Sequence, residues 1–264
     1  MALEINKNYL QNQQYKTSSN LEARIAIHKF TTSGESFHSW VWNKLKLVEP
    51  VDILDVGCGT GKFWVENYSK LPEGSTLVMT DFSEGMIEKA KQNLSYDGIK
   101  FEVADIENLT YQDNSFNIVM ANHVVYHSQD KNKALSELKR VCVVDGKVAI
   151  TTNSEQHMLK VYDIGVSLDK NFPVDRIIDT FTEEVADKML NQYFKKIDKF
   201  VSADILKVPD ADVVVNYIRT VVEPRKINVQ NDFFDKYREI VLEEIEKEGF
   251  FTIQKRSPVY ICSN

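Results

Sequence analysis

Three glycines at alternate positions follow an acidic residue, a pattern that suits the binding of an elongated small molecule. The acid is Asp55, it comes after the apolar run 51–54, and the glycines are Gly57, Gly59 and Gly61. Glycines leave no side chain between backbone and ligand, and they reach the positive dihedral angles that a tight strand-to-helix turn needs. The dinucleotide fingerprint G-x-G-x-x-G fails at its third glycine here, and an acid in the motif favours a cationic ligand over a pyrophosphate.

Acidic residues also follow the next two apolar runs. Asp81 comes after 77–80, about twenty residues beyond the glycine turn, and Asp105 comes after 99–104. A carboxylate at the position of Asp81 suits ribose hydroxyls, because it accepts two hydrogen bonds from a diol.

The elements that must position these acids alternate between strand and helix. After strands at 51–54, 77–80 and 99–104, we expect a strand at 115–121, a helix at 131–143, a turn at Asp145-Gly146 and a strand at 147–152. This rhythm predicts a parallel, doubly wound sheet with its ligand at the carboxyl ends of the strands.

These motifs resemble those of the class I S-adenosylmethionine-dependent methyltransferases, over about residues 50 to 153. The resemblance implies that Phe82 and Met86 flank the adenine, that Asp105 takes its amino group and that the amide of Ile106 meets the ring. It implies a cofactor site made of Arg24, Asp55, Gly57, Cys58, Gly59, Gly61, Asp81, Phe82, Met86, Asp105, Ile106 and Asn122. The family usually has aspartate at Asn117 and proline-glycine at Asp145-Gly146, and we expect neither position to touch the cofactor.

The fold expected from this resemblance is α/β: a doubly wound, Rossmann-like, seven-stranded sheet. It is mostly parallel with an antiparallel last strand, and it has helices on both faces and a helical cap. We expect a single methyltransferase domain over 1–264, comprising an amino-terminal helical lid at 1–49, a cofactor-binding core at 50–153, an acceptor-side insertion at 154–195, and final strands and helices at 196–264.

The two ends of the chain are expected to define the acceptor pocket. Tyr15, Trp40, Trp42 and Tyr126 are either walls of that pocket or core anchors, and Arg24 either pairs with the cofactor's carboxylate or is an exposed helical arginine. Further elements are expected as helices at 20–29, 155–166, 211–221 and 232–248, a helix capped by Thr182, and strands at 197–208, 250–254 and 259–262.

Methyl transfer from a sulfonium mainly requires alignment of acceptor, methyl carbon and sulfur. A nitrogen or oxygen acceptor that must lose a proton suggests a general base. His123 and His127, just after the fourth strand, are the candidates, since an imidazole titrates near neutral pH. His127 is alternatively a structural residue beneath the cofactor.

Composition restricts the functions that the chain can have. The net charge of −7 argues against a nucleic-acid substrate, because nucleic-acid binding relies on lysine and arginine. No apolar run reaches a membrane span, and the three cysteines lack metal-site or disulfide spacing, which favours a reducing, cytoplasmic location. We therefore expect a metal-free monomer or homodimer that methylates a nitrogen or oxygen of a small molecule or short peptide. The alternatives are a nucleotide-dependent oxidoreductase and a non-catalytic S-adenosylmethionine-binding protein.

Overall fold

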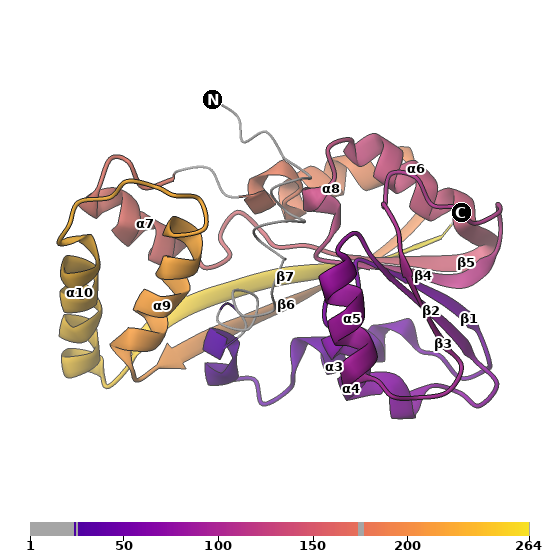
Figure 1. The fold of residues 1–264 in the computed structure, drawn as a ribbon, viewed down its shortest axis with the longest axis horizontal. Coiled ribbons are helices and arrows are strands. Elements are labelled where there is room, and N and C mark those ends of the chain that lie inside the picture. Colours follow the sequence, from indigo (N-terminus) through magenta and orange to yellow (C-terminus); the bar gives the residue numbers. More distant parts are fainter. Residues whose placement is uncertain (1–23, 25, 174–176, 264) are drawn as a thin grey trace.

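One seven-stranded sheet organises the computed structural model, which describes residues 24, 26–173 and 177–263 (Figure 1). The strand order is β3-β2-β1-β4-β5-β7-β6. The strands are β1 Asp52–Val56, β2 Thr76–Asp81, β3 Ile99–Val103, β4 Phe116–Asn122, β5 Cys142–Thr151, β6 Lys196–Val208 and β7 Phe251–Ser263. Strands β1 to β5 pair in parallel and β7 pairs antiparallel with both neighbours, so the predicted doubly wound sheet with an antiparallel last strand is confirmed.

Helices cover both faces of the sheet. The α-helices are α3 Phe37–Leu45, α4 Lys62–Asn67, α5 Glu84–Asn93, α6 Lys131–Val141, α7 Leu159–Leu168, α8 Glu183–Met189, α9 Ala211–Val222 and α10 Phe233–Glu248. Short 3₁₀ helices are η2 Ile27–Phe30, η3 Tyr68–Lys70, η4 Val125–His127, η5 Ile177–Thr180 and η6 Leu190–Gln192. The predicted cap of α8 is confirmed, because the Thr182 hydroxyl accepts a hydrogen bond from the amide of Val185 at 3.3 Å.

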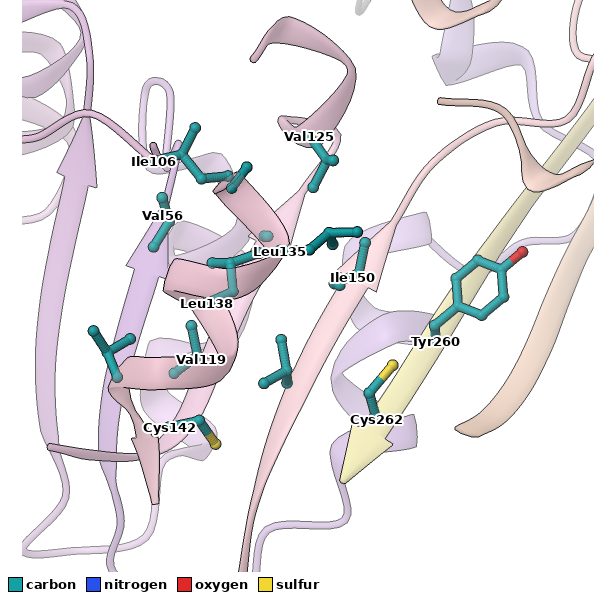
Figure 2. Packing of buried hydrophobic residues seen from close by; sticks show 14 of the residues in the cluster. Val56, Ile106, Val119, Val125, Leu135, Leu138, Cys142, Ile150, Tyr260 and Cys262 are labelled. Atoms are coloured by element: carbon teal, nitrogen blue, oxygen red, sulfur yellow. The ribbon is translucent and has the colours of Figure 1, made fainter. Parts of the chain in front are cut away.

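The core consists of separate hydrophobic clusters on the two faces. On one face, α6 and α8 pack on β1, β4, β5 and β7, with Leu135 and Leu138 of α6 fully buried (Figure 2). On the other face, Val41, Trp42 and Trp64 of α3 and α4 pack against the same strands, together with residues of α5. Because α3 contributes to this core, the described part of the expected amino-terminal lid includes a helix that packs on the sheet.

A third cluster forms a cap at the far end of a long hairpin. Strands β6 and β7 pair along thirteen residues each, whereas β5 pairs with β7 only over Val259–Cys262. The protruding half of the hairpin carries α7, α9 and α10, which lie together away from β1–β4 (Figure 1). Tyr237 of α10 donates a hydrogen bond to the carbonyl of Val161 in α7 at 2.8 Å, so segments 76 residues apart are joined. The expected helical cap is thus built largely from carboxyl-terminal helices.

The expected turn at Asp145-Gly146 is wrong, since both residues lie inside β5, which begins at Cys142. The pairing of β4 with β5 jumps from Phe116 opposite Cys142 to Ile118 opposite Lys147, so the extra residues of β5 bulge out. A Cβ on Gly146 would lie 2.6 Å from the carbonyl oxygen of Asn117. Glycine is required here by the close approach of two strands.

The remaining boundary differences are small. Helix α7 begins at Leu159, four residues later than expected. Half of the expected helix at 20–29 falls outside the described residues, of which 27–30 form the 3₁₀ helix η2. No helix among the described residues has the length and apolar character that crossing a bilayer requires.

Candidate cofactor and acceptor site

A cavity of about 920 Å³ lies at the carboxyl ends of β1, β2 and β4. Its lining begins at the glycine turn and continues past the segment before α3 to residues of β6, β7, α7 and α9. The fold therefore brings together residues that lie as far apart in the sequence as Arg24 and Ser257.

The glycine turn leaves its backbone open to this cavity. Gly57 has φ +75°, and a Cβ there would lie 2.5 Å from Cγ2 of Val124, so both the conformation and the space exclude a side chain. The amides of Gly57 and Cys58 donate to the carbonyl of Thr80 at 2.7 and 2.8 Å, which ties the turn to β2.

Asp81 joins the turn to the end of β2. Its carboxylate accepts hydrogen bonds from the amides of Gly59 and Ser83, both at 2.9 Å. Burial raises the pKa of Asp81, and the hydrogen bonds from Ser83 and Gly59 oppose that rise. Because an ionised carboxylate has about four acceptor positions, Asp81 keeps acceptor capacity for a diol in the cavity.

Asp55 carries a buried oxygen atom whose hydrogen-bonding capacity is unused. Its side chain is 1% exposed, and Trp64 Nε1 donates to Oδ2 at 2.8 Å. Oδ1 is buried and has no hydrogen-bond partner among the described residues. Burial raises the pKa of Asp55 to about 7, the Trp64 hydrogen bond opposes this, and the Asp81 charge adds to it.

Asn122 places a second unsatisfied group beside Asp55. Asp55 is in register with Met120 of β4, so Asn122 lies two residues farther along on the same face of the sheet. Both amide atoms of Asn122 are buried without a hydrogen-bond partner in the described part of the chain. Buried polar groups are normally satisfied, so Asp55 and Asn122 fit a polar, cationic ligand such as the amino group of S-adenosylmethionine.

The residues expected around the adenine also line the cavity. They are Phe82, Met86, Asp105 and Ile106. Met86 is buried in the first turn of α5, and Asp105 Oδ1 accepts a hydrogen bond from the amide of Glu107 at 3.0 Å, which fixes the turn after β3. The structure thus groups three apolar side chains and a carboxylate in the lining of the cavity.

His123 and His127 line the cavity, but their electrostatic surroundings differ from the expectation. Burial lowers the pKa of both imidazoles to about 3, with smaller contributions from nearby positive groups. Burial thus keeps both imidazoles neutral at pH 7, and their role as a general base stays a prediction. His123 adopts φ +53°, its amide donates to the Thr151 hydroxyl at 3.0 Å, and its ring lies 5.3 Å from that of Phe37.

Comparison with known proteins identifies the family. Residues 48–182 match the model of a methyltransferase domain. The chain belongs to the class I S-adenosylmethionine-dependent methyltransferases. This assignment replaces the oxidoreductase alternative, and it makes S-adenosylmethionine the cofactor of the protein.

Individual relatives of this methyltransferase differ in their acceptors. It is 31% identical over 188 residues to a malonyl-[acyl-carrier protein] O-methyltransferase of Buchnera aphidicola, covering 63% of this chain and 73% of that protein. It is 32% identical over 112 residues to a demethylmenaquinone methyltransferase of Bacteroides fragilis, covering 41% and 45%. Matches to most of these curated relatives span about half of their length.

Solved structures share the fold of the methyltransferase. A Haemonchus contortus phosphoethanolamine N-methyltransferase in complex with phosphomonomethylethanolamine and S-adenosylhomocysteine superposes with a TM-score of 0.56 at 17% identity. That superposition covers 97% of this chain and 59% of the other.

The aromatic residues expected at the acceptor pocket of the methyltransferase separate into two groups. Tyr126 lines the cavity, as does Arg24. Trp40 and Trp42 do not appear in the lining, because Trp42 is buried against Trp64 and Trp40 stacks behind Phe37, with ring centroids 5.7 Å apart. Their role as core anchors, the alternative left open by the sequence, fits this placement. Tyr15 lies outside the described residues.

Sequence reasoning missed several polar residues that the structure brings to the cavity. His38 Nδ1 lies 3.0 Å from Glu66 Oε1, and His28, His157 and Lys255 line the part between the sheet and the cap. These residues come from η2, α3, α4, β7 and the segment before α7, and no local motif connects them.

Proposed function

We propose that this methyltransferase transfers a methyl group to a nitrogen or oxygen of a small molecule or short peptide. The observation that carries the proposal is one continuous cavity. It runs from the glycine turn at Gly57 to Tyr162, Tyr217 and Lys255 near the cap hairpin. The part of the cavity near Gly57 suits the cofactor, and the part near the cap hairpin offers space for an acceptor of limited size.

The relatives' names cover methylation of oxygen, nitrogen and carbon, so they leave the acceptor atom open. Their names include an O-methyltransferase and a phosphoethanolamine N-methyltransferase, and one acts on demethylmenaquinone. The net charge of −7 supports the exclusion of nucleic acid as the acceptor. We propose that the described residues act as one domain, with the cap as its acceptor side, in the cytoplasm as a monomer or homodimer.

The work left to the protein is binding and alignment. When bound, S-adenosylmethionine supplies a methyl group already activated by the sulfonium. Asp81 would hold the ribose, while Asp55 and Asn122 would hold the amino-acid end through the buried atoms that have no partner. Orientation of this kind is worth about 7 to 11 kcal/mol of barrier.

We propose His38, in place of His123 or His127, as the residue that accepts a proton from the acceptor. Nδ1–H of His38 donates to Glu66 at 3.0 Å, which leaves Nε2 to accept a proton. The hydrogen bond from His38, together with one from Ser36, lowers the pKa of Glu66 to about 2 against the opposing effect of burial, so Glu66 stays ionised beside the imidazole. A carboxylate placed in this way stabilises the imidazolium that forms on proton transfer.

Calorimetry and a release assay test the proposal. Wild-type protein is expected to bind S-adenosylhomocysteine, and Asp81→Ala is expected to weaken that binding by tenfold or more, because it removes a hydrogen-bonded carboxylate. Release of S-adenosylhomocysteine from S-adenosylmethionine is then measured with a panel of small amines, carboxylates, phenols and short peptides. Absence of cofactor binding would refute the proposal. Binding without turnover of any acceptor would instead favour the non-catalytic alternative.

A further inference from the structure

The acceptor half of the cavity contains a lysine whose ion pair is too long to be a hydrogen bond. Lys255 lies on β7 directly opposite Asp204 of β6, and its side chain is 13% exposed. The distance from Nζ to Asp204 Oδ2 is 4.0 Å, and no hydrogen bond of this ammonium is found among the described residues. Buried lysines are normally paired, so this ammonium has unused donor capacity in a ligand cavity.

Asp204 does not accept a hydrogen bond from Lys255. Its carboxylate already accepts hydrogen bonds from the hydroxyls of Thr32 and Ser33, both at 3.1 Å, and from the amide of Ile205 at 2.7 Å. Burial lowers the pKa of Lys255, and the Asp204 charge opposes this only in part. An anionic ligand would provide the missing partner.

His157 is held against the strand that carries Lys255. Its Nδ1 lies 3.2 Å from both the amide nitrogen and the carbonyl oxygen of Arg256, and 3.2 Å from Oγ of Ser257. Burial keeps the ring neutral by lowering its pKa well below the usual value. The imidazole therefore adds no positive charge beside Lys255.

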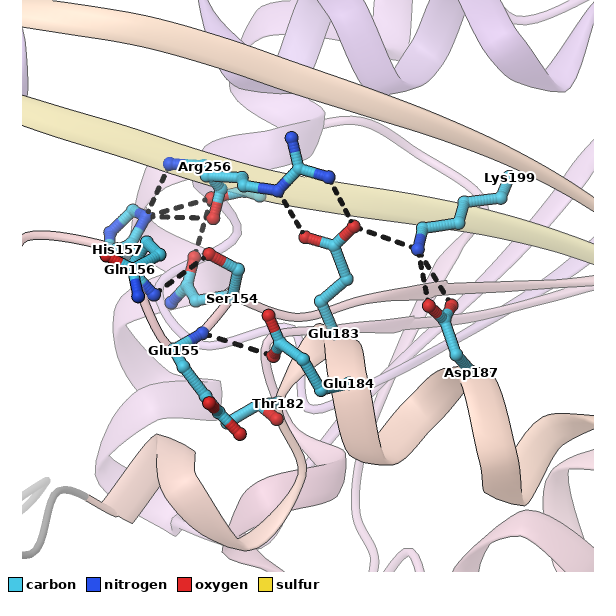
Figure 3. A network of polar contacts seen from close by, with 12 residues as sticks. Ser154, Glu155, Gln156, His157, Thr182, Glu183, Glu184, Asp187, Lys199 and Arg256 are labelled. Carbon is cyan, nitrogen blue, oxygen red and sulfur yellow. Dashed lines mark hydrogen bonds and ion pairs between the residues drawn. The ribbon is translucent and has the colours of Figure 1, made fainter.

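The strand geometry separates Lys255 from the neighbouring ion-pair network. Arg256 pairs with Glu183 of α8 through two contacts of 2.7 Å, and Lys199 joins the same carboxylate (Figure 3). Because side chains alternate along β7, Lys255 and Ser257 face the opposite side, where both line the cavity. The network anchors β7 and leaves Lys255 available.

We propose that the acceptor carries a carboxylate or phosphate group, which Lys255 binds in the space between sheet and cap. Tyr162 and Tyr217 line the same space and suit an apolar or aromatic body attached to the anion. This inference rests on the proposed methyltransferase function and specifies its acceptor class. Charge-assisted hydrogen bonds of this kind correspond to about tenfold or more in affinity.

The test compares anionic probes with neutral analogues of the same shape. Protein saturated with S-adenosylhomocysteine is titrated with phenyl phosphate and phenol, and with benzoate and benzamide, by calorimetry. At least one anion is expected to bind tenfold or more tightly than its neutral analogue. Lys255→Met should abolish that preference and Lys255→Arg should retain it. The first pair of probes reports a phosphate and the second a carboxylate.

A matched control comes from the same hairpin. Lys207 is exposed on β6 and does not appear in the cavity lining, so Lys207→Met makes the same charge change and should keep the preference. Unchanged affinity for S-adenosylhomocysteine shows that Lys255→Met is folded. Equal binding of anions and neutral analogues by the wild type, or a preference retained in Lys255→Met, would overturn this inference. Loss of S-adenosylhomocysteine binding by the wild type would overturn the proposed function instead.

Discussion

Replacing Asp55 by asparagine should stabilise the ligand-free protein at alkaline pH while weakening cofactor binding. Asp55 is 1% exposed, and burial raises its pKa from 3.8 to about 7. The folded state therefore binds more protons than the unfolded state between these pH values, and stability falls as the pH rises through this window. Asparagine cannot ionise, and its carbonyl oxygen can still accept the hydrogen bond from Trp64.

The size of the effect follows from the pKa. At 1.36 kcal/mol per pH unit, ionising Asp55 costs about 4 kcal/mol of folding free energy above pH 7. The amide nitrogen of the new asparagine takes the place of Oδ1 and is a buried donor without a hydrogen-bond partner. This lowers the free energy of unfolding by about 1–3 kcal/mol. At pH 8.5 the free energy of unfolding of Asp55→Asn should therefore exceed that of the wild type by about 1–3 kcal/mol. The difference between the two proteins should increase by about 3 kcal/mol from pH 5 to pH 8.5.

Urea denaturation of the ligand-free proteins at the two pH values measures this difference. Asp145→Asn is the matched control, since Asp145 is exposed and its substitution should change stability by less than about 0.5 kcal/mol. Calorimetry should show that Asp55→Asn binds S-adenosylmethionine tenfold or more weakly. Wild-type binding at pH 6 should release up to one proton, because a cation stabilises the ionised carboxylate. An advantage of Asp55→Asn that does not increase with pH would refute the reasoning.

Three further predictions address the turn, the ion-pair network and the proposed base. Gly57→Ala should lose about 2 kcal/mol or more of stability and most of its affinity for S-adenosylhomocysteine, because its Cβ meets Val124 at 2.5 Å; denaturation and calorimetry measure both. Arg256→Met should lose about 2 kcal/mol in urea denaturation, because it removes two hydrogen bonds from the buried Glu183; no loss would contradict this. His38→Gln should lower kcat by 10² or more with unchanged cofactor affinity, and unchanged kcat would exclude this base.

The cofactor end of the site could be predicted because its signals are local. The glycines after Asp55 and the acid after 77–80 follow from strand periodicity and turn chemistry within short stretches. The strands β1, β2 and β4 then bring those stretches to one edge of the sheet.

The acceptor end depends on contacts between segments that are distant in the sequence, so no local sequence pattern could predict it. The pair of His38 and Glu66 joins residues 28 positions apart, and Lys255 meets Asp204 only through the register of β6 with β7. The low pKa values of His123 and His127 come from tertiary burial. The Asp145-Gly146 dipeptide has the composition of a turn, but pairing with β4 overrides that preference.

The long hairpin of β6 and β7 separates the hydrophobic core of the cap from the hydrophobic core of the sheet. The apolar residues of α7, α9 and α10 pack mainly with one another and with the outer half of the hairpin, in a cluster that shares no described residue with the clusters on the two faces of the sheet. Mutations in the cores of these helices should therefore leave the glycine turn and the ends of β1, β2 and β4 undisturbed. Descendants of one ancestral fold can in this way acquire new methyl acceptors while inheriting an unchanged donor site.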